Sequence, residues 1–326
     1  MRRAALLLLL LAAGCTGTHE PEVPAVVAAA DGGGVGFYLS SAWNRGETGG
    51  LGRWEVAGVR DLLAWGDRLY LLTEGRLVRY RTDGFAADSV PAEDEAREAS
   101  WELDCPGRGL AAGDWDLIVV CEDGGVRRLG LLASESEESS AEDTADLAGF
   151  EALSFALYPD RRAGLDRLAY AYARSRGWHL EVAGDGGEPY LSLDRDQPEV
   201  VSATALGFFE GMGLGAAASG GGEGRVYLLG EELAELASAG VELHRVVGGG
   251  GVLAGFGRGF LLVSTEGGKA SQTYTEYRAG WLHPDLYLYL AADERVEVLD
   301  VVALPELERR QVPVPGVVAI AGFPLE

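Results

Sequence analysis

The chain of 326 residues contains almost no lysine, and its basic residues are far outnumbered by acidic ones. Lysine and arginine together number 27 against 51 aspartates and glutamates, which gives a formal net charge of −24. A surface of this charge repels phosphate backbones, so we expect no nucleic-acid partner, and it also disfavours direct docking on anionic lipid. We interpret the charge as a source of solubility. The 47% of hydrophobic residues suffices for a large core, which excludes global disorder.

Histidine is also scarce, which bears on metal and catalytic chemistry. Its four occurrences, His19, His179, His244 and His283, show no metal-ligand spacing, so we expect no metal site and no cofactor. His179 and His283 are interpreted as structural. No G-x-S-x-G motif occurs, although a catalytic triad whose members meet only in space stays open. The acidic run 135–146 lacks the alternating Asp/Asn and Gly of a calcium loop, and we interpret it as solvated.

No apolar run is long enough to span a membrane. The longest candidate, residues 4–13, has ten residues, whereas a spanning helix needs roughly 20. It follows Arg2 and Arg3 and precedes small residues, which is the arrangement of an export signal.

The end of this run, "LAAGC", resembles the lipobox of bacterial lipoprotein signals. The resemblance implies that residues 1–14 are a signal peptide removed after Gly14, and that Cys15 is acylated and attaches the chain to a membrane. Ala12 departs from the pattern, because leucine is commoner there. Thr16 after the cysteine implies the outer membrane in bacteria that have one. The alternative is an ordinary signal that happens to contain a cysteine. Residues 15–33, small and ending in glycine, are expected to form a flexible tether.

Two further cysteines, Cys105 and Cys121, lie where disulfides persist if the chain is exported. The segment between them reads as strand, turn and strand, with the turn around Gly113 and Asp114. Antiparallel pairing about that turn places Cys105 opposite Cys121, close enough for a disulfide. The alternative is two small buried thiols.

The rest of the chain repeats one element, an apolar run that often follows Asp, Arg or Gly and ends in an acidic or small cluster. Its seven instances are "FYLSS" from Phe37, "RLYLLTEG" from Arg68, "DLIVVCEDG" from Asp116, "DRLAYAYA" from Asp166, "RVYLLG" from Arg225, "GFLLVSTEG" from Gly259 and "DLYLYLAAD" from Asp285. Residues 62–75, 110–123 and 253–266 share a longer frame of strand, turn and strand. Several units continue into an alternating third strand, such as "RLVRYRT".

These repeats predict an all-β fold, a β-propeller over residues 34–326 whose blades are antiparallel meanders. We favour seven blades, and the uneven steps of 26 to 58 residues between instances leave six or eight open. The end of the chain, "PGVVAIAGFPLE", resembles the first strand of a unit, while the first unit begins with a second-strand pattern. We therefore expect the C-terminal strand to complete the N-terminal blade. The pattern resembles that of bacterial seven-bladed propellers, and the alternative is an unrelated β-sandwich.

Other segments are expected to serve the same architecture. Residues 231–240 and 141–153 could form short helical turns. The glycine motifs at 211–215, 220–224 and 255–259 lack the strand-to-helix context of a phosphate cradle, and we interpret them as turns.

These features lead to a hypothesis of a non-catalytic lipoprotein of the cell envelope that binds or scaffolds another envelope protein, a peptide or a glycan. A lipoprotein propeller in outer-membrane protein assembly has that arrangement. The alternative is a propeller enzyme, of hydrolase or lactonase type, with a site at the central channel. A third hypothesis is a structural component of the envelope without a small ligand.

Overall fold

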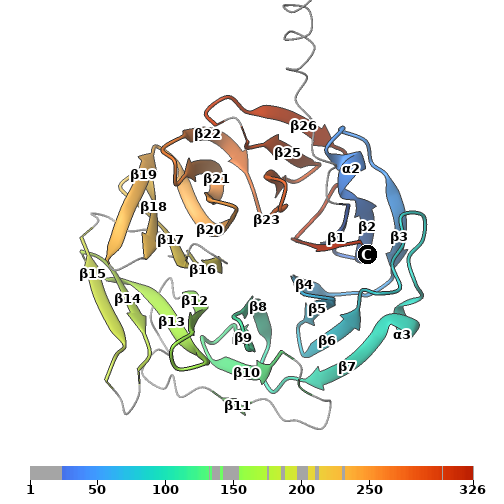
Figure 1. Cartoon of the computed structure of the whole chain (residues 1–326), viewed down its shortest axis with the longest axis horizontal. Coiled ribbons are helices and arrows are strands. Elements are labelled where there is room, and N and C mark those ends of the chain that lie inside the picture. The colour runs from blue at the N-terminus through green and yellow to red at the C-terminus, as the bar shows by residue number, and fades with distance from the viewer. Residues whose placement is uncertain are drawn as a thin grey trace, which may run out of the picture.

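The computed structural model describes residues 24–131, 133, 140–141, 154–174, 176–184, 188–196, 205–209, 213–229, 232–302 and 304–325. In these residues seven small antiparallel sheets stand around a central axis as the blades of a β-propeller (Figure 1). The predicted all-β class and the predicted seven blades are therefore confirmed.

Each blade is a meander that runs from a strand at the axis to a strand at the rim. From inner to outer strand, the blades are β27 (Ala319–Pro324), β1 (Ala25–Asp31), β2 (Gly34–Leu39), β3 (Gly50–Trp54); β4 (Val59–Trp65), β5 (Arg68–Thr73), β6 (Arg76–Arg81), β7 (Arg97–Glu102); β8 (Gly107–Ala112), β9 (Asp116–Cys121), β10 (Val126–Gly130), β11 (Ser140–Ala141); β12 (Ser154–Asp160), β13 (Leu165–Arg174), β14 (Gly177–Val182), β15 (Leu191–Arg195); β16 (Ala205–Phe209), β17 (Gly213–Gly220), β18 (Glu223–Leu229), β19 (Leu233–Ala239); β20 (Glu242–Gly249), β21 (Val252–Ser264), β22 (Lys269–Glu276); and β23 (Ala279–Leu282), β24 (Tyr287–Ala291), β25 (Val296–Asp300), β26 (Glu308–Val312). Two single-turn helices, α2 (Ser40–Trp43) and α3 (Glu93–Ala96), lie in connections.

The seven inner strands contact one another in a closed ring around the axis. They run in the same direction, so all of them begin at one face of the ring, called the front face here, and end at the other, the back face. Every inner-to-second-strand turn consequently lies at the back face.

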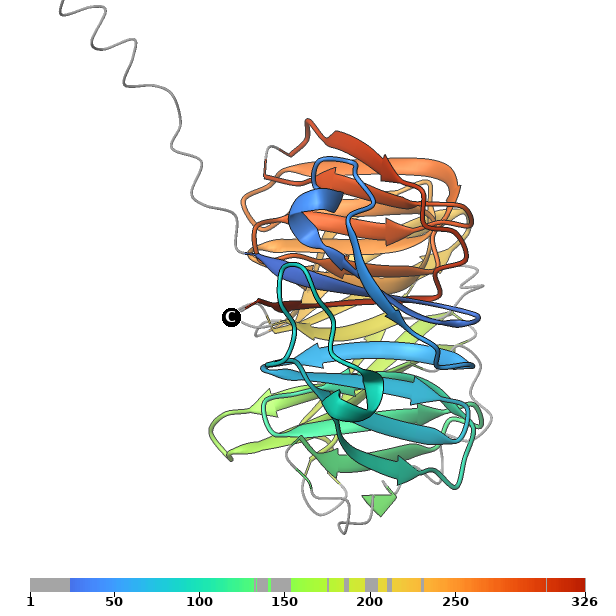
Figure 2. The same ribbon diagram turned by 90° about the vertical axis from the view of Figure 1, so that its right-hand side faces the viewer.

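The ring is closed by the C-terminal strand, as predicted. Strand β27 pairs with β1 from Ala25–Pro324 to Ala30–Ala319 and forms the inner strand of the blade whose other three strands come from the N-terminal end. The N–H of Leu325 donates to the carbonyl of Pro24 at 2.9 Å, so both ends of the described chain lie together at the back face (Figure 2).

The expected boundary between tether and propeller at residue 34 is wrong. None of the residues from Ala25 to Ala30 is more than 3% exposed, and they form β1, the second strand of its blade. Their small side chains suggested a linker, but small residues also suit a strand that is packed tightly on both sides. Residues 15–23 of the expected tether, and the expected signal peptide 1–14, lie outside the described residues.

All seven repeat instances lie in buried central strands, as their composition indicates. Four of them occupy the second strand of a blade (β5, β9, β13, β24), and those in β2 and β18 occupy the third. The seventh, from Gly259, lies in the second half of β21, which pairs with β22. Both central strands of a four-stranded blade are covered on both faces, so their sequences look alike and position cannot be read from composition alone.

Strand β21 contains the predicted turn at 255–259. Its first half pairs with β20 and its second half with β22, with a register shift at Arg258 and Gly259, where φ is +116°. The residues that flank this 13-residue strand are joined, because the N–H of Thr265 donates to the carbonyl of Gly251 at 2.9 Å. An extended strand would hold its ends roughly 40 Å apart, so β21 must reverse on itself.

The helical turn expected at 231–240 is wrong, because Leu233–Ala239 forms β19, the outer strand of its blade. Pairing with β18 overrides the intrinsic helix preference of its Glu, Leu and Ala residues. Of the other expected turn, residues 142–153 lie outside the described residues. The motif at 220–224 forms the predicted turn, with positive φ at Gly221 and Gly222, whereas residues 211–212 are not described.

The predicted disulfide between Cys105 and Cys121 is present, with the two Cα atoms 5.9 Å apart. The predicted register differs, because Cys121 lies opposite Gly107 and a bulge follows. Cys105 therefore precedes β8 and reaches its partner across the open end of the hairpin. In the part of the chain that is described, no helix is long and apolar enough to cross a membrane.

Candidate functional site

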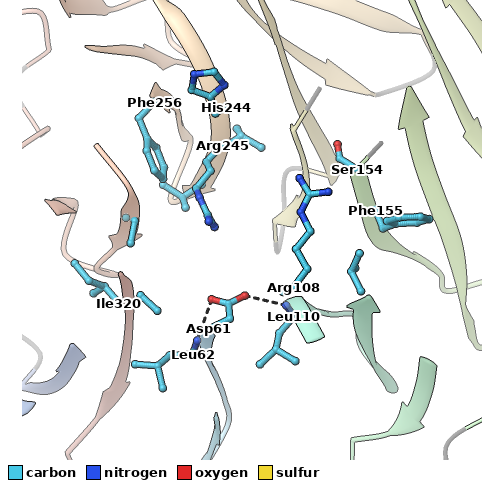
Figure 3. A pocket seen from close by; sticks show the side chains of 17 residues that line it. Asp61, Leu62, Arg108, Leu110, Ser154, Phe155, His244, Arg245, Phe256 and Ile320 are labelled. Atoms are coloured by element: carbon cyan, nitrogen blue, oxygen red, sulfur yellow. Dashed lines mark hydrogen bonds between the residues drawn. The ribbon is translucent and has the colours of Figure 1, made fainter. Parts of the chain in front are cut away.

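A cavity of about 460 Å³ opens at the front end of the central channel (Figure 3). Its wall is built mainly from the opening residues of six inner strands, β4, β8, β12, β20, β23 and β27. This volume lies in the range of small-molecule sites, roughly 300–1,000 Å³. The channel mouth is therefore the candidate site, and the sequence alone assigns no residue to it.

Asp61 of β4 lies in the wall of the cavity and joins two blades. Its Oδ1 accepts a hydrogen bond from the N–H of Leu62 at 2.9 Å, and its Oδ2 accepts one from the N–H of Leu110 in β8 at 2.8 Å. Burial raises the pKa of Asp61 above its ordinary value of 3.8, and the charge of Arg245 and the two amides oppose that rise. The carboxyl group thus fixes β4 against β8 directly below the open space.

Arg108 of β8 and Arg245 of β20 bring two positive charges to the same cavity. Figure 3 shows both guanidinium groups in the open space above the Asp61 carboxyl group. Neither guanidinium group has a hydrogen bond or a close ion pair with another described residue, although the charge of Arg245 acts on Asp61 from a greater distance. Most other arginines are paired: Arg79 lies 2.9 Å from Glu98, and Arg167 lies 2.8 Å from Asp160.

Register shifts in the inner strands position these groups. The ladder shifts between Val59 and Asp61 in β4, between Gly107 and Gly109 in β8, and between Leu243 and Arg245 in β20. A bulge inserts an extra residue and redirects the side chains around it, and bulges are frequent beside functional sites. Three inner strands therefore break their alternation at the level of the cavity.

The remaining wall is largely apolar. Leu62, Leu110, Phe155, Phe256 and Ile320 line it, and they come from five different strands. Ser154 also lines the cavity, and its buried Oγ has no hydrogen-bond partner within the described ranges. The cavity consequently combines these apolar side chains with the charged and polar ones, and it exposes somewhat more polar than apolar surface.

The histidines that the sequence singled out do not meet. His179 is buried on β14, with Nδ1 3.0 Å from Asp194 and Nε2 3.4 Å from Glu181. His283 is fully buried, and its Nδ1 accepts from the N–H of Asp285 at 3.0 Å. His244 lines the channel mouth and lies 3.6 Å from Glu242. His19 lies outside the described residues, and no group of three metal-ligating side chains occurs in the part described.

Sequence reasoning missed Asp61, Arg108 and Arg245. One signal was available, because the inner strands "VRDLLAW", "GRGLAA" and "ELHRVVGG" each carry charge near their first residues. These charges indicate a common site only when the fold is known, because the fold places the starts of the three strands around one cavity.

The structure thus shows a seven-bladed β-propeller with a cavity at the mouth of its channel, and comparison with solved structures agrees on the fold. The chain is similar to AztD of Citrobacter koseri in its apo form, with 13% identity, 92% of this chain and 98% of that chain covered, and a TM-score of 0.53. It is also similar to a protein of unknown function from Desulfotomaculum acetoxidans (11% identity, 92% and 99% covered, TM-score 0.58). A protein from Lactobacillus plantarum gives 13% identity, the same coverage and a TM-score of 0.57.

At these identities the likeness extends to the fold alone. No protein-family model matches the chain, and a search of curated proteins finds no relative.

Proposed function

We propose that this protein is a lipid-anchored binding module of the cell envelope, attached through Cys15 and not itself catalytic. It resides on the extracytoplasmic side, at the outer membrane where the organism has one. The front face of the propeller receives another envelope protein, a peptide or a glycan, or a smaller ligand derived from one of these.

The observation that carries this proposal is the placement of the chain's start and of the cavity on opposite faces. Pro24 lies at the back face beside Leu325, whereas the cavity opens at the front. Nine residues separate Cys15 from Ala25, which span at most roughly 30 Å when extended. An anchor at Cys15 would hold the back face near the membrane and leave the channel mouth directed away from it.

The alternative of a channel enzyme is not favoured by a specific contact. The cavity contains Asp61, His244 and Ser154, but no hydrogen bond joins any two of them in the described chain. A nucleophile needs a base within hydrogen-bond reach, so this set supports binding better than nucleophilic catalysis.

Fractionation of the envelope tests the anchor. A Cys15→Ser variant should move from the membrane fraction to the soluble fraction, while a Cys105→Ser/Cys121→Ser double variant should stay with the membrane. Retention of Cys15→Ser in the membrane fraction would refute the anchor.

Site-specific photo-crosslinking tests the orientation. Tyr274 is fully exposed beside the start of β20 at the front face, and Val302 is 66% exposed beyond the end of β25 at the back face. A crosslinker at residue 274 should capture a discrete envelope partner, and one at residue 302 should capture lipid. The reverse pattern would contradict the proposed orientation.

A further inference from the structure

We infer that the channel mouth binds an organic carboxylate, with Arg108 and Arg245 holding the carboxylate and the apolar wall holding the rest of the ligand. This inference rests on the proposed binding function and names the class of ligand. The occupant is a small carboxylic acid or the C-terminus of a peptide, which share the recognised group.

The charge balance of the cavity is the first argument. In a chain with a net charge of −24, two arginines without ion pairs among the described residues occupy one cavity. Asp61 can offset at most one of their charges, and it is already held by two backbone N–H groups. An anion placed between the guanidinium groups would complete the balance, and carboxylates bind arginine through paired, charge-assisted hydrogen bonds.

The apolar wall distinguishes an organic carboxylate from an inorganic anion. Phe155 and Phe256 lie on different sides of the cavity, and Leu62, Leu110 and Ile320 line its lower part (Figure 3). Most of these side chains are already buried in the chain itself, so the apolar surface that remains exposed lies at the mouth. Inorganic phosphate would leave that remainder in water, whereas an aromatic or branched aliphatic body would cover it, at roughly 25 cal/mol for each Å² removed from water.

The mouth also contains a side-chain hydroxyl group that no described residue hydrogen-bonds. The Oγ of Ser154 is buried without a partner in the described chain, and a hydroxyl can donate to a ligand oxygen. An ionised Asp61 has no hydrogen to donate and cannot pair with a ligand carboxylate. It acts instead as a positioning residue that holds β4 against β8, and with β8 the backbone of Arg108.

Calorimetric titration of the full chain with matched probes tests the inference. N-acetylphenylalanine should bind, whereas its neutral amide and inorganic phosphate should bind at least about tenfold more weakly, because a charge-assisted pair or the apolar contact is lost. Equal binding of the acid and its amide, or no binding of the acid, would overturn the inference. A hexapeptide ending in phenylalanine, with its C-terminal amide as control, separates the two sources. If N-acetylphenylalanine binds and the hexapeptide does not, the site takes small acids. If the hexapeptide binds more tightly than N-acetylphenylalanine and its amide does not bind, the site takes peptide C-termini.

Variants assign the interaction to the two arginines. Arg108→Gln and Arg245→Gln should each weaken binding of N-acetylphenylalanine by about tenfold or more. Arg162→Gln removes the same charge from an exposed back-face position and should change binding by less than about twofold. Equal effects of all three variants would show general charge attraction and refute the site. Because the membrane fractionation above needs no ligand, failure of this inference and failure of the anchor are distinguishable.

Discussion

Two aspartates, Asp166 and Asp61, each accept at least one hydrogen bond from the backbone N–H groups of a neighbouring blade, but one lies in a closed junction and the other beside an open cavity. Asp166, at the start of β13, accepts hydrogen bonds from the N–H groups of Asp114, Trp115 and Asp116 in the β8–β9 turn, at 3.1, 2.9 and 2.7 Å. Asp61 accepts two N–H groups at the channel mouth, one of them likewise from the neighbouring blade. In both cases a carboxyl group joins one blade to the backbone of the next.

The difference lies in the space around each carboxyl group. A Cβ atom added at Gly113 would overlap the Asp166 carboxyl group, and Arg128 fills the other side by donating to the Asp116 carboxylate and the Asp166 carbonyl. The junction at Asp166 is thus closed and satisfied. The mouth at Asp61 instead keeps open volume and two guanidinium groups without a hydrogen bond or close ion pair among the described residues.

The closed junction should show the largest effect on stability. Asp166→Ala leaves three N–H groups without their acceptor, and we expect a loss of about 4 kcal/mol in the free energy of unfolding. Urea unfolding measures it. Glu102→Ala, which removes an exposed pair with Arg76, is the control and should cost less than about 1 kcal/mol. Similar losses for the two variants would show that the junction is not a special contact.

The disulfide should show the next largest effect. It ties the front end of the same β8–β9 hairpin whose turn is held by Asp166 at the back. Replacing both cysteines with serine should cost about 3 kcal/mol in the chain-entropy model. Guanidinium unfolding with and without reductant checks this, since reductant should affect only the wild type. Because Cys105 precedes β8, reduction should also weaken ligand binding through Arg108, and unchanged binding would separate the disulfide from the site.

A pH effect should follow from Asp61. Its folded pKa is raised above 3.8, so its contribution to stability is fully present below that value and is lost as the pH rises through the folded pKa. The wild type should therefore lose stability relative to Asp61→Asn as the pH rises. Urea unfolding of both proteins at a series of pH values from below 3.8 upward gives the difference between their free energies of unfolding. A difference that grows in favour of the wild type would mean that the ionised form is the stabilised one.

The smallest effect on stability should come from the arginines of the mouth. Arg108→Gln and Arg245→Gln remove no ion pair, so the free energy of unfolding should change by no more than about 0.5 kcal/mol. Thermal unfolding of the unliganded variants measures this. A loss as large as that of Asp166→Ala would show that the arginines are structural, and the contrast between the two regions would fail.

Local sequence predicted well which strands are buried, and less well which position each strand occupies in its blade. The apolar runs in β5, β9 and β13 predict buried central strands, because a strand covered on both faces has apolar side chains on both sides. The sequence alone did not predict β1, because its alanines and valines also suit a linker. It did not predict the outer strand β19 either, because the residues of β19 favour a helix and only pairing with β18 makes them a strand.

The site was out of reach for a further physical reason. Asp61, Arg108 and Arg245 belong to three separate blades. Asp61 and Arg245 follow a bulge and Arg108 lies within one, and alternation rules do not anticipate bulges. The disulfide was accessible because its partners belong to one hairpin, and even there the bulge displaced the expected register.

The pairing of β27 with β1 also sets the order in which this protein can become functional. The two strands lie at opposite ends of the described chain, so their ladder is the contact that spans the greatest distance in sequence. Contacts of this kind form late, because the chain between them must be ordered first. Strand β27 also contributes Ala319 and Ile320 to the cavity. A chain without its last strand would have an incomplete cavity wall, so the ligand binding proposed above would depend on closure of the ring by β27.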